Sequence, residues 1–190
     1  MGFIFESSTL LFMNLKTLKS HIKYETFKRL NTGGIPLEPQ EIRSNILSLR
    51  GDKKYKELIK KYEKIELNFL SEKDIKSRKD MELFLEFSLI SEYKKFIKIF
   101  NEKQENTNNK KTFELLLDDY TEYVDIEKLI DILENYKEFL KLCETFKFKK
   151  YDKEKQKNTG IFINQYFEIS SFIYFKNKDY LTEENLKKMF

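Results

Sequence analysis

Cysteine and histidine are almost missing from this chain of 190 residues, which has only Cys143 and His21 of these two types. One cysteine excludes a disulfide framework and fits a reducing compartment, so we expect a cytoplasmic protein. One histidine excludes every zinc site or nuclease centre that needs two. No stretch approaches the roughly 18 uninterrupted apolar residues of a membrane span, and the first residues lack the basic region and cleavage site of a signal peptide. We therefore expect no membrane partner.

Alanine and tryptophan are absent, and only four of the 36 basic residues are arginines. This bias is typical of an AT-rich coding sequence and by itself indicates no function. Three of the arginines, Arg29, Arg43 and Arg50, nevertheless lie close together in the sequence. An arginine kept in a lysine-rich chain indicates a need for the planar guanidinium. Apolar residues make up 40% and charged residues 36%, which excludes a disordered chain and a membrane protein.

The spacing of the apolar residues predicts a mainly α protein, a helical bundle-like domain of about seven helices. The two prolines and five glycines offer little turn chemistry for a large sheet. At most one or two short strands are expected, near residues 3–12, and exposed apolar side chains there would favour a homo-oligomer. Segments with helical spacing lie at residues 22–30, 39–49, 52–63, 83–90, 93–100, 113–123, 125–146 and 161–175, and Thr182 caps a last one.

Charge is spread almost evenly along the chain, whose net charge is +4. No segment has the concentrated positive charge of a dedicated DNA-binding arm. A weak basic run follows the long helix expected at 125–146, and we interpret it as a solvated helix end and loop. It consists of Lys147, Lys149, Lys150, Lys153, Lys155 and Lys157.

One segment, residues 27–43, carries recognisable chemistry. It reads as a helix, a turn with two adjacent glycines, and a second helix. The glycines permit a positive φ and a close approach of the backbone to a ligand, and exposed amides at the next helix start suit an anion such as phosphate. The alternative is a tight turn with satisfied caps and no ligand. The candidate phosphate- or nucleotide-binding residues are Arg29, Asn31, Thr32, Gly33, Gly34, Glu41 and Arg43.

The second helix of this segment has its own start signals. Pro39 suits the first helical position, where no amide donor is needed. Glu41 is placed to reach back to the preceding cap residue, as in a capping box. We therefore predict a capped helix beginning at Pro39.

The same segment resembles a known family. The run Phe-x-Arg-Leu-Asn-Thr-Gly-Gly at 27–34, followed by Leu-x-x-Gln-Glu-Ile-Arg at 37–43, is similar to the signature of the N-terminal domain of GmrSD-type DNA restriction endonucleases, which is ParB-like and is also called domain of unknown function 262. Shorter segments at 78–83, 116–120 and 163–168 resemble further motifs of that family in the same order. The resemblance covers roughly residues 20–175.

The resemblance implies a part of a phage-defence protein rather than a complete enzyme. The family's Asp-Gly-Gln-Gln-Arg motif, linked to nucleotide hydrolysis, is absent, and one histidine could not build its His-Asn-His nuclease domain. We expect residues 1–50 to be the end of a ParB-like domain, which includes the glycine turn, and residues 51–190 to be a helical domain. Catalytic residues and metal ligands are not expected.

Two functions remain open from the sequence. In the first, the chain is a non-catalytic component or fragment that binds DNA or nucleotide phosphate weakly or through a separately encoded ParB-like or nuclease subunit. A nucleotide with magnesium would then bind only when the missing half is supplied. In the second, the chain is a helical protein–protein interaction module with a purely structural glycine turn.

Other candidate residues favour structural roles. Asp118 and Asp119 would need further converging carboxylates to bind magnesium. Asp80 and Glu82 are two positions apart and point to different faces of their helix. Cys143 lies on an apolar stripe and is expected to be an inert core residue.

Overall fold

A computed structural model describes residues 37–50, 53–95 and 109–190. The chain divides into two compact units, residues 1–36 and 37–190, and the described residues belong to the second. The helix predicted at 22–30, the strands predicted near 3–12, His21 and the glycine turn lie outside the described residues. So does most of the helix predicted at 93–100.

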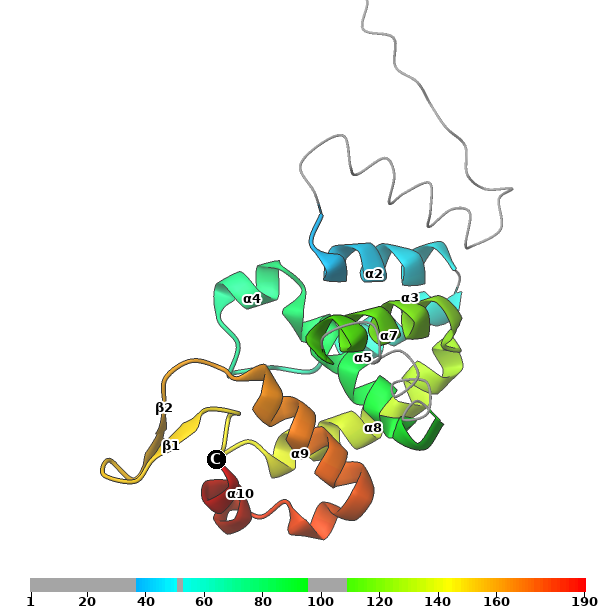
Figure 1. Ribbon diagram of the computed structural model, residues 1–190. Coiled ribbons are helices and arrows are strands. Elements are labelled where there is room, and N and C mark those ends of the chain that lie inside the picture. Colours follow the sequence, from blue (N-terminus) through cyan, green and yellow to red (C-terminus); the bar gives the residue numbers. More distant parts are fainter. Residues whose placement is uncertain (1–36, 51–52, 96–108) are drawn as a thin grey trace, which may run out of the picture. The chain divides into compact units, whose positions relative to one another are not determined.

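The described unit is mainly α, as predicted (Figure 1). Its α-helices are α2 (Pro39–Leu49), α3 (Lys53–Tyr62), α4 (Glu72–Lys76), α5 (Lys79–Ser91), α7 (Asn109–Tyr123), α8 (Ile126–Leu142), α9 (Asn164–Asn177) and α10 (Glu183–Met189), and the short 3-10 helix η1 (Lys178–Tyr180) follows α9. Two short antiparallel strands, β1 (Lys150–Asp152) and β2 (Lys157–Thr159), form a hairpin between α8 and α9.

Helix α5 is the centre of this unit. It contacts α2, α4, α7, α8 and α9. Nearly every residue from Met81 to Ile90 is buried, so the helix is apolar on all sides and has no solvent-facing stripe. Two polar residues, Glu86 and Ser88, are buried with them.

Aromatic rings fill the core between α5, α8 and α9. The ring of Phe87 lies 5.0 Å from that of Phe139 and 5.1 Å from that of Tyr136. Phe167 of α9 packs edge-on against Phe139 at 5.4 Å. Rings at these separations add to the free energy gained from apolar burial. The phenylalanine-rich composition therefore fills the core.

Several predicted helix boundaries are confirmed. Asp125 caps α8, since its Oδ1 accepts a hydrogen bond from the backbone N–H of Glu127 at 3.0 Å. Thr182 caps α10 by accepting from the N–H of Asn185 at 3.2 Å. These side chains satisfy amides that have no partner within the first helical turn.

The prediction for residues 143–157 was wrong in two respects. Helix α8 ends at Leu142, four residues before the predicted Phe146, because the chain must turn to bury both Phe146 and Phe148. Lys147 and Phe148 both have positive φ, which a right-handed helix does not allow. The basic segment that follows forms the β1–β2 hairpin rather than a loop.

Candidate functional site

Five of the seven predicted site residues lie outside the described residues, namely Arg29, Asn31, Thr32, Gly33 and Gly34. The anion site predicted around the glycine turn therefore remains a prediction. The other two, Glu41 and Arg43, lie on α2, which packs against α7 and α5 within the unit 37–190.

Glu41 closes the start of α2 as predicted. Its Oε2 accepts a hydrogen bond from the backbone N–H of Glu38 at 2.9 Å, and Pro39 occupies the first helical turn. A carboxylate in this position satisfies a free amide and also favours the positive end of the helix dipole. Glu41 thus has a structural role in the described residues.

Arg43 points inward and is paired. Its side chain is only 3% exposed, and its Nε donates to Asp118 Oδ1 on α7 at 2.7 Å. Its Nη1 lies 3.7 Å from Glu82 Oε2 on α5. A phosphate would have to compete with two carboxylates for this guanidinium. Arg50 also ties α2 to α7, by donating to the carbonyl oxygen of Thr121 at 3.0 Å.

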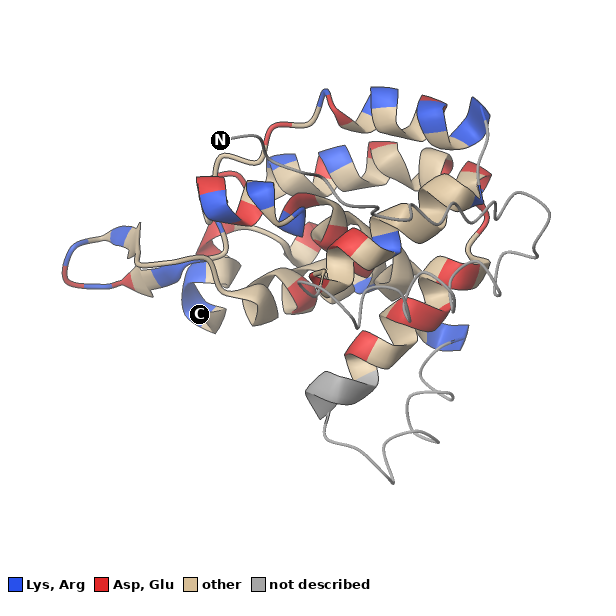
Figure 2. Ribbon diagram, turned by 90° about the horizontal axis from the view of Figure 1, so that it is seen from above, with Lys and Arg blue, Asp and Glu red and all other residues tan. Residues whose placement is uncertain are grey.

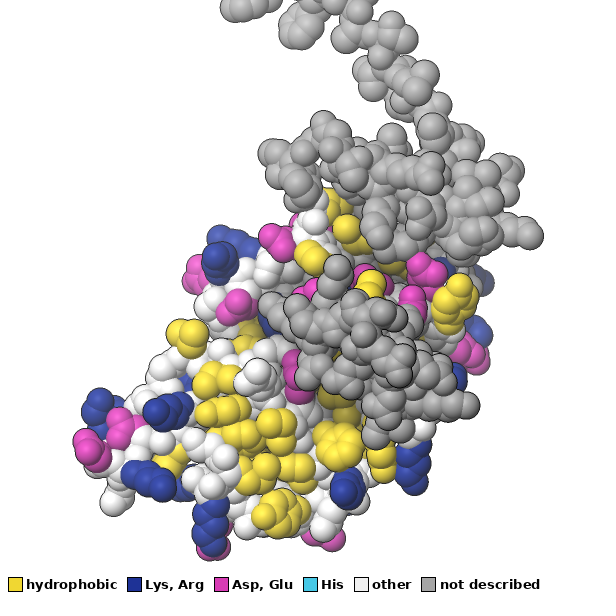
Figure 3. Space-filling model, in the orientation of Figure 1, with side chains coloured by type: hydrophobic (Ala, Val, Ile, Leu, Met, Phe, Trp, Pro, Cys, Tyr) yellow, Lys and Arg dark blue, Asp and Glu magenta, His cyan; other side chains and the backbone are white. Residues whose placement is uncertain are grey.

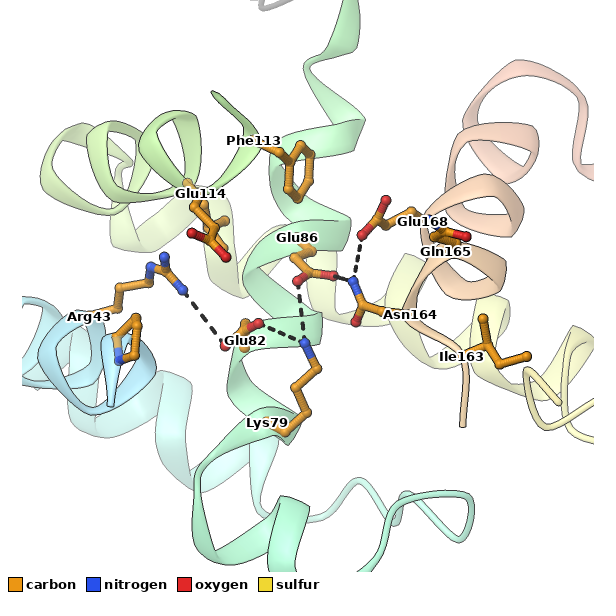
Figure 4. Close-up of a pocket in the computed structure, with 12 residues that line it drawn as sticks. Arg43, Lys79, Glu82, Glu86, Phe113, Glu114, Ile163, Asn164, Gln165 and Glu168 are labelled. Carbon is orange, nitrogen blue, oxygen red and sulfur yellow. Dashed lines mark hydrogen bonds and ion pairs between the residues drawn. The ribbon is translucent and has the colours of Figure 1, made fainter. Parts of the chain in front are cut away.

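A cavity of about 650 Å³ lies beside Arg43 and is bordered by α2, α5, α7 and α9 (Figure 4). We call it the polar pocket. Its lining includes two cations and four carboxylates: Arg43, Lys79, Glu82, Glu86, Glu114 and Glu168. If all are ionised, the lining carries an excess of negative charge, which disfavours an anion.

Lys79 links the carboxylates of α5. Its Nζ lies 2.6 Å from Glu82 Oε1 and 3.6 Å from Glu86 Oε1. Positions 79, 82 and 86 have the spacing of one helix face, so the three side chains reach the same side of α5. Burial alone would lower the pKa of Lys79, but the nearby carboxylates, Glu86 first, outweigh it and raise that pKa.

Glu86 has the strongest electrostatic perturbation in the polar pocket. It is 3% exposed, and burial raises its pKa to about 8 despite the attraction of Lys79. The two partners thus shift in ways that differ in consequence, since Lys79 is held charged while Glu86 is driven towards its neutral form. We attribute this to burial, because the Glu86 side chain is 4% exposed whereas that of Lys79 is 22% exposed and has two carboxylates beside it.

Asn164 connects α9 to the network of charged side chains on α5. Its Nδ2 donates to Glu168 Oε1 at 2.5 Å and to Glu86 Oε2 at 3.3 Å (Figure 4). Burial raises the pKa of Glu168, against the opposing hydrogen bond from Asn164. Three of the four carboxylates, Glu82, Glu86 and Glu168, are therefore already bonded by protein groups from three helices.

This arrangement does not suit a metal ion. The ammonium of Lys79 occupies the position between Glu82 and Glu86 where a cation would sit. Over residues 37–50, 53–95 and 109–190, no group of three or more histidine, cysteine, aspartate or glutamate side chains could hold a metal. Asp118 is instead the partner of Arg43.

Other predictions about individual residues can be compared with the structure. Glu82 faces the polar pocket, whereas Asp80 approaches Tyr62 on another side of α5. Cys143 is buried, and burial raises the pKa of its thiol to about 12, so it is an inert core residue. In the part of the chain that is described, no helix is long and apolar enough to cross a membrane.

Lys79, Glu86 and Glu114 also line this cavity and were not predicted from the sequence. Glu86 had a detectable signal, since it is the one charge inside the apolar run from Leu83 to Ile90. A charge in such a run is buried, so it needs partners on neighbouring elements. The partners themselves could not be identified, because Asn164 lies 78 residues away along the chain.

The motifs that carry the family resemblance meet at the polar pocket. Arg43 comes from the first signature, and Glu82 and Asp118 come from the next two segments. Asn164 and Glu168, from the last segment, reach the same network through Glu86. Tyr120 of the third segment also shares a hydrogen bond of 2.6 Å with Ser88 of α5. Three of the four stretches are thus in direct contact, and the fourth bonds to Glu86, on the helix that holds the second.

Comparison with known proteins finds no matching family model, no similar curated protein and no similar solved structure.

Proposed function

We propose that the chain is a non-catalytic component of a GmrSD-like DNA-defence protein, which binds DNA or nucleotide phosphate weakly or through a partner subunit. One observation carries the proposal: residues of the first three motif segments contact one another beside the polar pocket, and Asn164 of the fourth bonds to Glu86, on the same helix as the second. If the similarity of four short stretches were due to chance, they would not be expected to lie together in space. Residues that together form one structural site would be expected to lie together.

In this proposal the polar pocket does not receive the phosphate, since its lining holds more carboxylates than cations. Glu82 of the pocket and Asp118 fix Arg43, and through it α2, whose start at Pro39 follows the turn after four residues of sequence. The phosphate donors would be the backbone amides at 32–35 together with Arg29 and Asn31. Nucleotide with magnesium would need the ParB-like half of the site from a partner.

The decisive experiment is a titration of the labelled full chain. The amide resonances of Gly33 and Gly34 are followed while phosphate, a nucleotide with magnesium, or a short DNA duplex is added. A half-site should bind with a Kd of roughly millimolar, equivalent to about 4 kcal/mol, and binding should weaken with salt. Arg29→Ala should abolish the shift, whereas Asn177→Ala, at an exposed position, should leave it unchanged.

The opposite result would be clear. If both glycine amides stay still in every titration while Asn31→Ala strongly lowers the melting temperature, the turn is structural and phosphate binding at this site is rejected.

The second candidate is a helical interaction module, and the surface of α9 favours it. Ile161, just before α9, is 83% exposed, and Ile169 within it is 44% exposed. Figure 3 shows hydrophobic side chains gathered on the face over this helix. Exposed apolar patches mark contact surfaces. A single monomer at high concentration, measured by light scattering, together with no binding of a dye for apolar surfaces, would contradict this candidate.

A further inference from the structure

The β1–β2 hairpin concentrates positive charge that looks diffuse in the sequence. Residues 147–157 contain six lysines and only two acidic residues, Asp152 and Glu154, for a net charge of +4. Lys149 is half-buried, and the other five lysines are exposed. The strands pair Lys150 with Thr159 and Asp152 with Lys157, so lysines from both strands share one short ribbon.

Most of these lysines have no acidic partner. Lys155 lies 3.5 Å from Asp152 within the turn. No acidic residue of the described ranges lies within ion-pair distance of the other five, which are Lys147, Lys149, Lys150, Lys153 and Lys157. Their charge is therefore available to an external anion.

The hairpin extends away from the helices but is anchored at its base. Figures 1 and 2 both show it projecting from the rest of the described unit. Asn158 Nδ2 donates to the carbonyl oxygen of Thr145 at 2.6 Å, just beyond α8. Lys187 of α10 lies over the ring of Tyr151 at 5.0 Å. The turn is ordered by Asp152, whose Oδ1 accepts from two backbone amides.

A groove of about 270 Å³ continues this charge towards α8. Four lysines and two glutamates line it, for an excess of two positive charges: Lys64, Lys137, Lys141, Lys147, Glu66 and Glu144. Among the described residues, Lys137 has an acidic partner, Glu134 at 2.7 Å, and the other three lysines have none within ion-pair distance. Lys147 lines the groove and is also one of the hairpin lysines, so the groove and the hairpin form one continuous basic region.

Helix α3, which packs beside α8, extends the same surface. Lys53, Lys56 and Lys60 are exposed and follow one another at helical spacing towards Lys64. Figure 2 shows the basic residues of α3 and of the end of α8 in two neighbouring rows. We call the hairpin lysines, the groove lysines and this stripe the basic surface.

We propose that the basic surface binds the phosphate backbone of DNA. This inference rests on the proposed function and names where the nucleic acid lies. The charges are spread along α3, the groove and a projecting hairpin instead of converging on one point, which suits a line of phosphates better than a single small anion. The surface contains lysine and no arginine, and lysine is a point charge without bidentate geometry, so the contact reads no base sequence.

The test uses the full chain and a labelled duplex of about 20 base pairs, with Kd measured by fluorescence anisotropy over a range of salt. The triple variant Lys150→Ala, Lys153→Ala, Lys157→Ala should raise Kd about a hundredfold at low salt and reduce the slope of log K against log salt by about three. A matched variant removes the same charge elsewhere: Lys94→Ala, Lys176→Ala, Lys178→Ala should change both values little. Arginine at the three hairpin positions should restore binding, which separates charge from folding.

The outcomes distinguish this inference from the proposed function. If the duplex binds and the hairpin and control variants weaken it equally, the basic surface is not the contact, while DNA binding stands. If the glycine amides respond to nucleotide but no duplex binds, only the inference fails. If neither ligand binds, both are rejected.

Discussion

The polar pocket and the basic surface use the same residue types in opposite ways. In the polar pocket Arg43 and Lys79 each face carboxylates and are largely buried. On the basic surface most lysines are exposed and have no acidic partner among the described residues. A buried charge must be paired, whereas an exposed lysine need not be. Paired charges therefore stabilise contacts between helices, whereas the unpaired lysines are available to bind a partner.

The largest expected effect comes from breaking the pairing of Arg43. Arg43→Ala leaves Asp118 without its cation and Glu82 with Lys79 alone, and both carboxylates are partly shielded from water. We expect the free energy of unfolding to fall by about 2–3 kcal/mol, less than for a fully buried pair. Urea denaturation followed by circular dichroism measures this fall.

A double-mutant cycle sharpens that result. Arg43→Ala combined with Asp118→Ala should cost less than the two single changes together, because the second change removes a charge that the first left unpaired. Lys150→Ala on the hairpin is the matched control and should leave stability unchanged. Equal losses from Arg43→Ala and Lys150→Ala would remove the distinction between the two regions.

A smaller effect concerns the pH dependence of stability. The pKa of Glu86 is raised from an ordinary value of 4.5 to about 8, so between these values the folded protein holds a proton that the unfolded chain has released. Stability should therefore fall as pH rises through this window and level off above it. We expect Glu86→Gln to remove about 1–2 kcal/mol of this fall.

The measurement is a series of urea denaturations across that pH window. Some dependence should persist in the variant, since burial also raises the pKa of Glu168. Glu66→Gln, an exposed control, should leave the wild-type profile as it is. A wild-type protein that becomes more stable as pH rises through the window would show that Glu86 is charged in the fold.

A still smaller effect is expected at the base of the hairpin. Asn158→Ala removes the hydrogen bond to Thr145 and should cost about 1 kcal/mol, felt locally because few contacts hold the ribbon. Amide hydrogen exchange should speed up at residues 150–159 and not in α5. Unchanged exchange in the hairpin would mean that Tyr151 and Lys187 alone suffice to anchor it.

The smallest effect is expected for an exposed pair on α3. Lys61 lies 2.8 Å from Glu57, one helical turn away, and both side chains are about half exposed. Such pairs contribute little to stability. Lys61→Ala should leave the melting temperature unchanged within error at physiological salt, and a clear drop would show that pairing matters on the surface as well.

The helices could be predicted because their signals are local. The stripe from Leu129 to Cys143 and the cap at Asp125 lie within one continuous segment, and both are confirmed in α8. The hairpin could not be predicted, since residues 152–157 contain no glycine, asparagine or proline and Gln156 nevertheless takes a positive φ. The Asn-Gly, Asp-Gly and Gly-Gly pairs that favour a two-residue hairpin turn are absent there.

The polar pocket depended on contacts that no local pattern specifies. The spacing of Lys79, Glu82 and Glu86 predicts one shared helix face, but not that Arg43, 75 residues before Asp118, reaches the same place. The glycine turn had the clearest sequence signal, and it remains a prediction because it lies outside the described residues.

Two residues with left-handed backbone conformation precede β1, and they affect the rate at which a ligand can associate with the β1–β2 hairpin. Lys147 and Phe148 adopt positive φ, which costs free energy for residues other than glycine, and buried Phe146 and Phe148 hold them there. The β1–β2 hairpin is thus ordered before any ligand binds, and little conformational entropy remains to be lost on binding. The association rate with a polyanion would then be limited by diffusion and by the electrostatic field of the lysines, and not by folding of the hairpin.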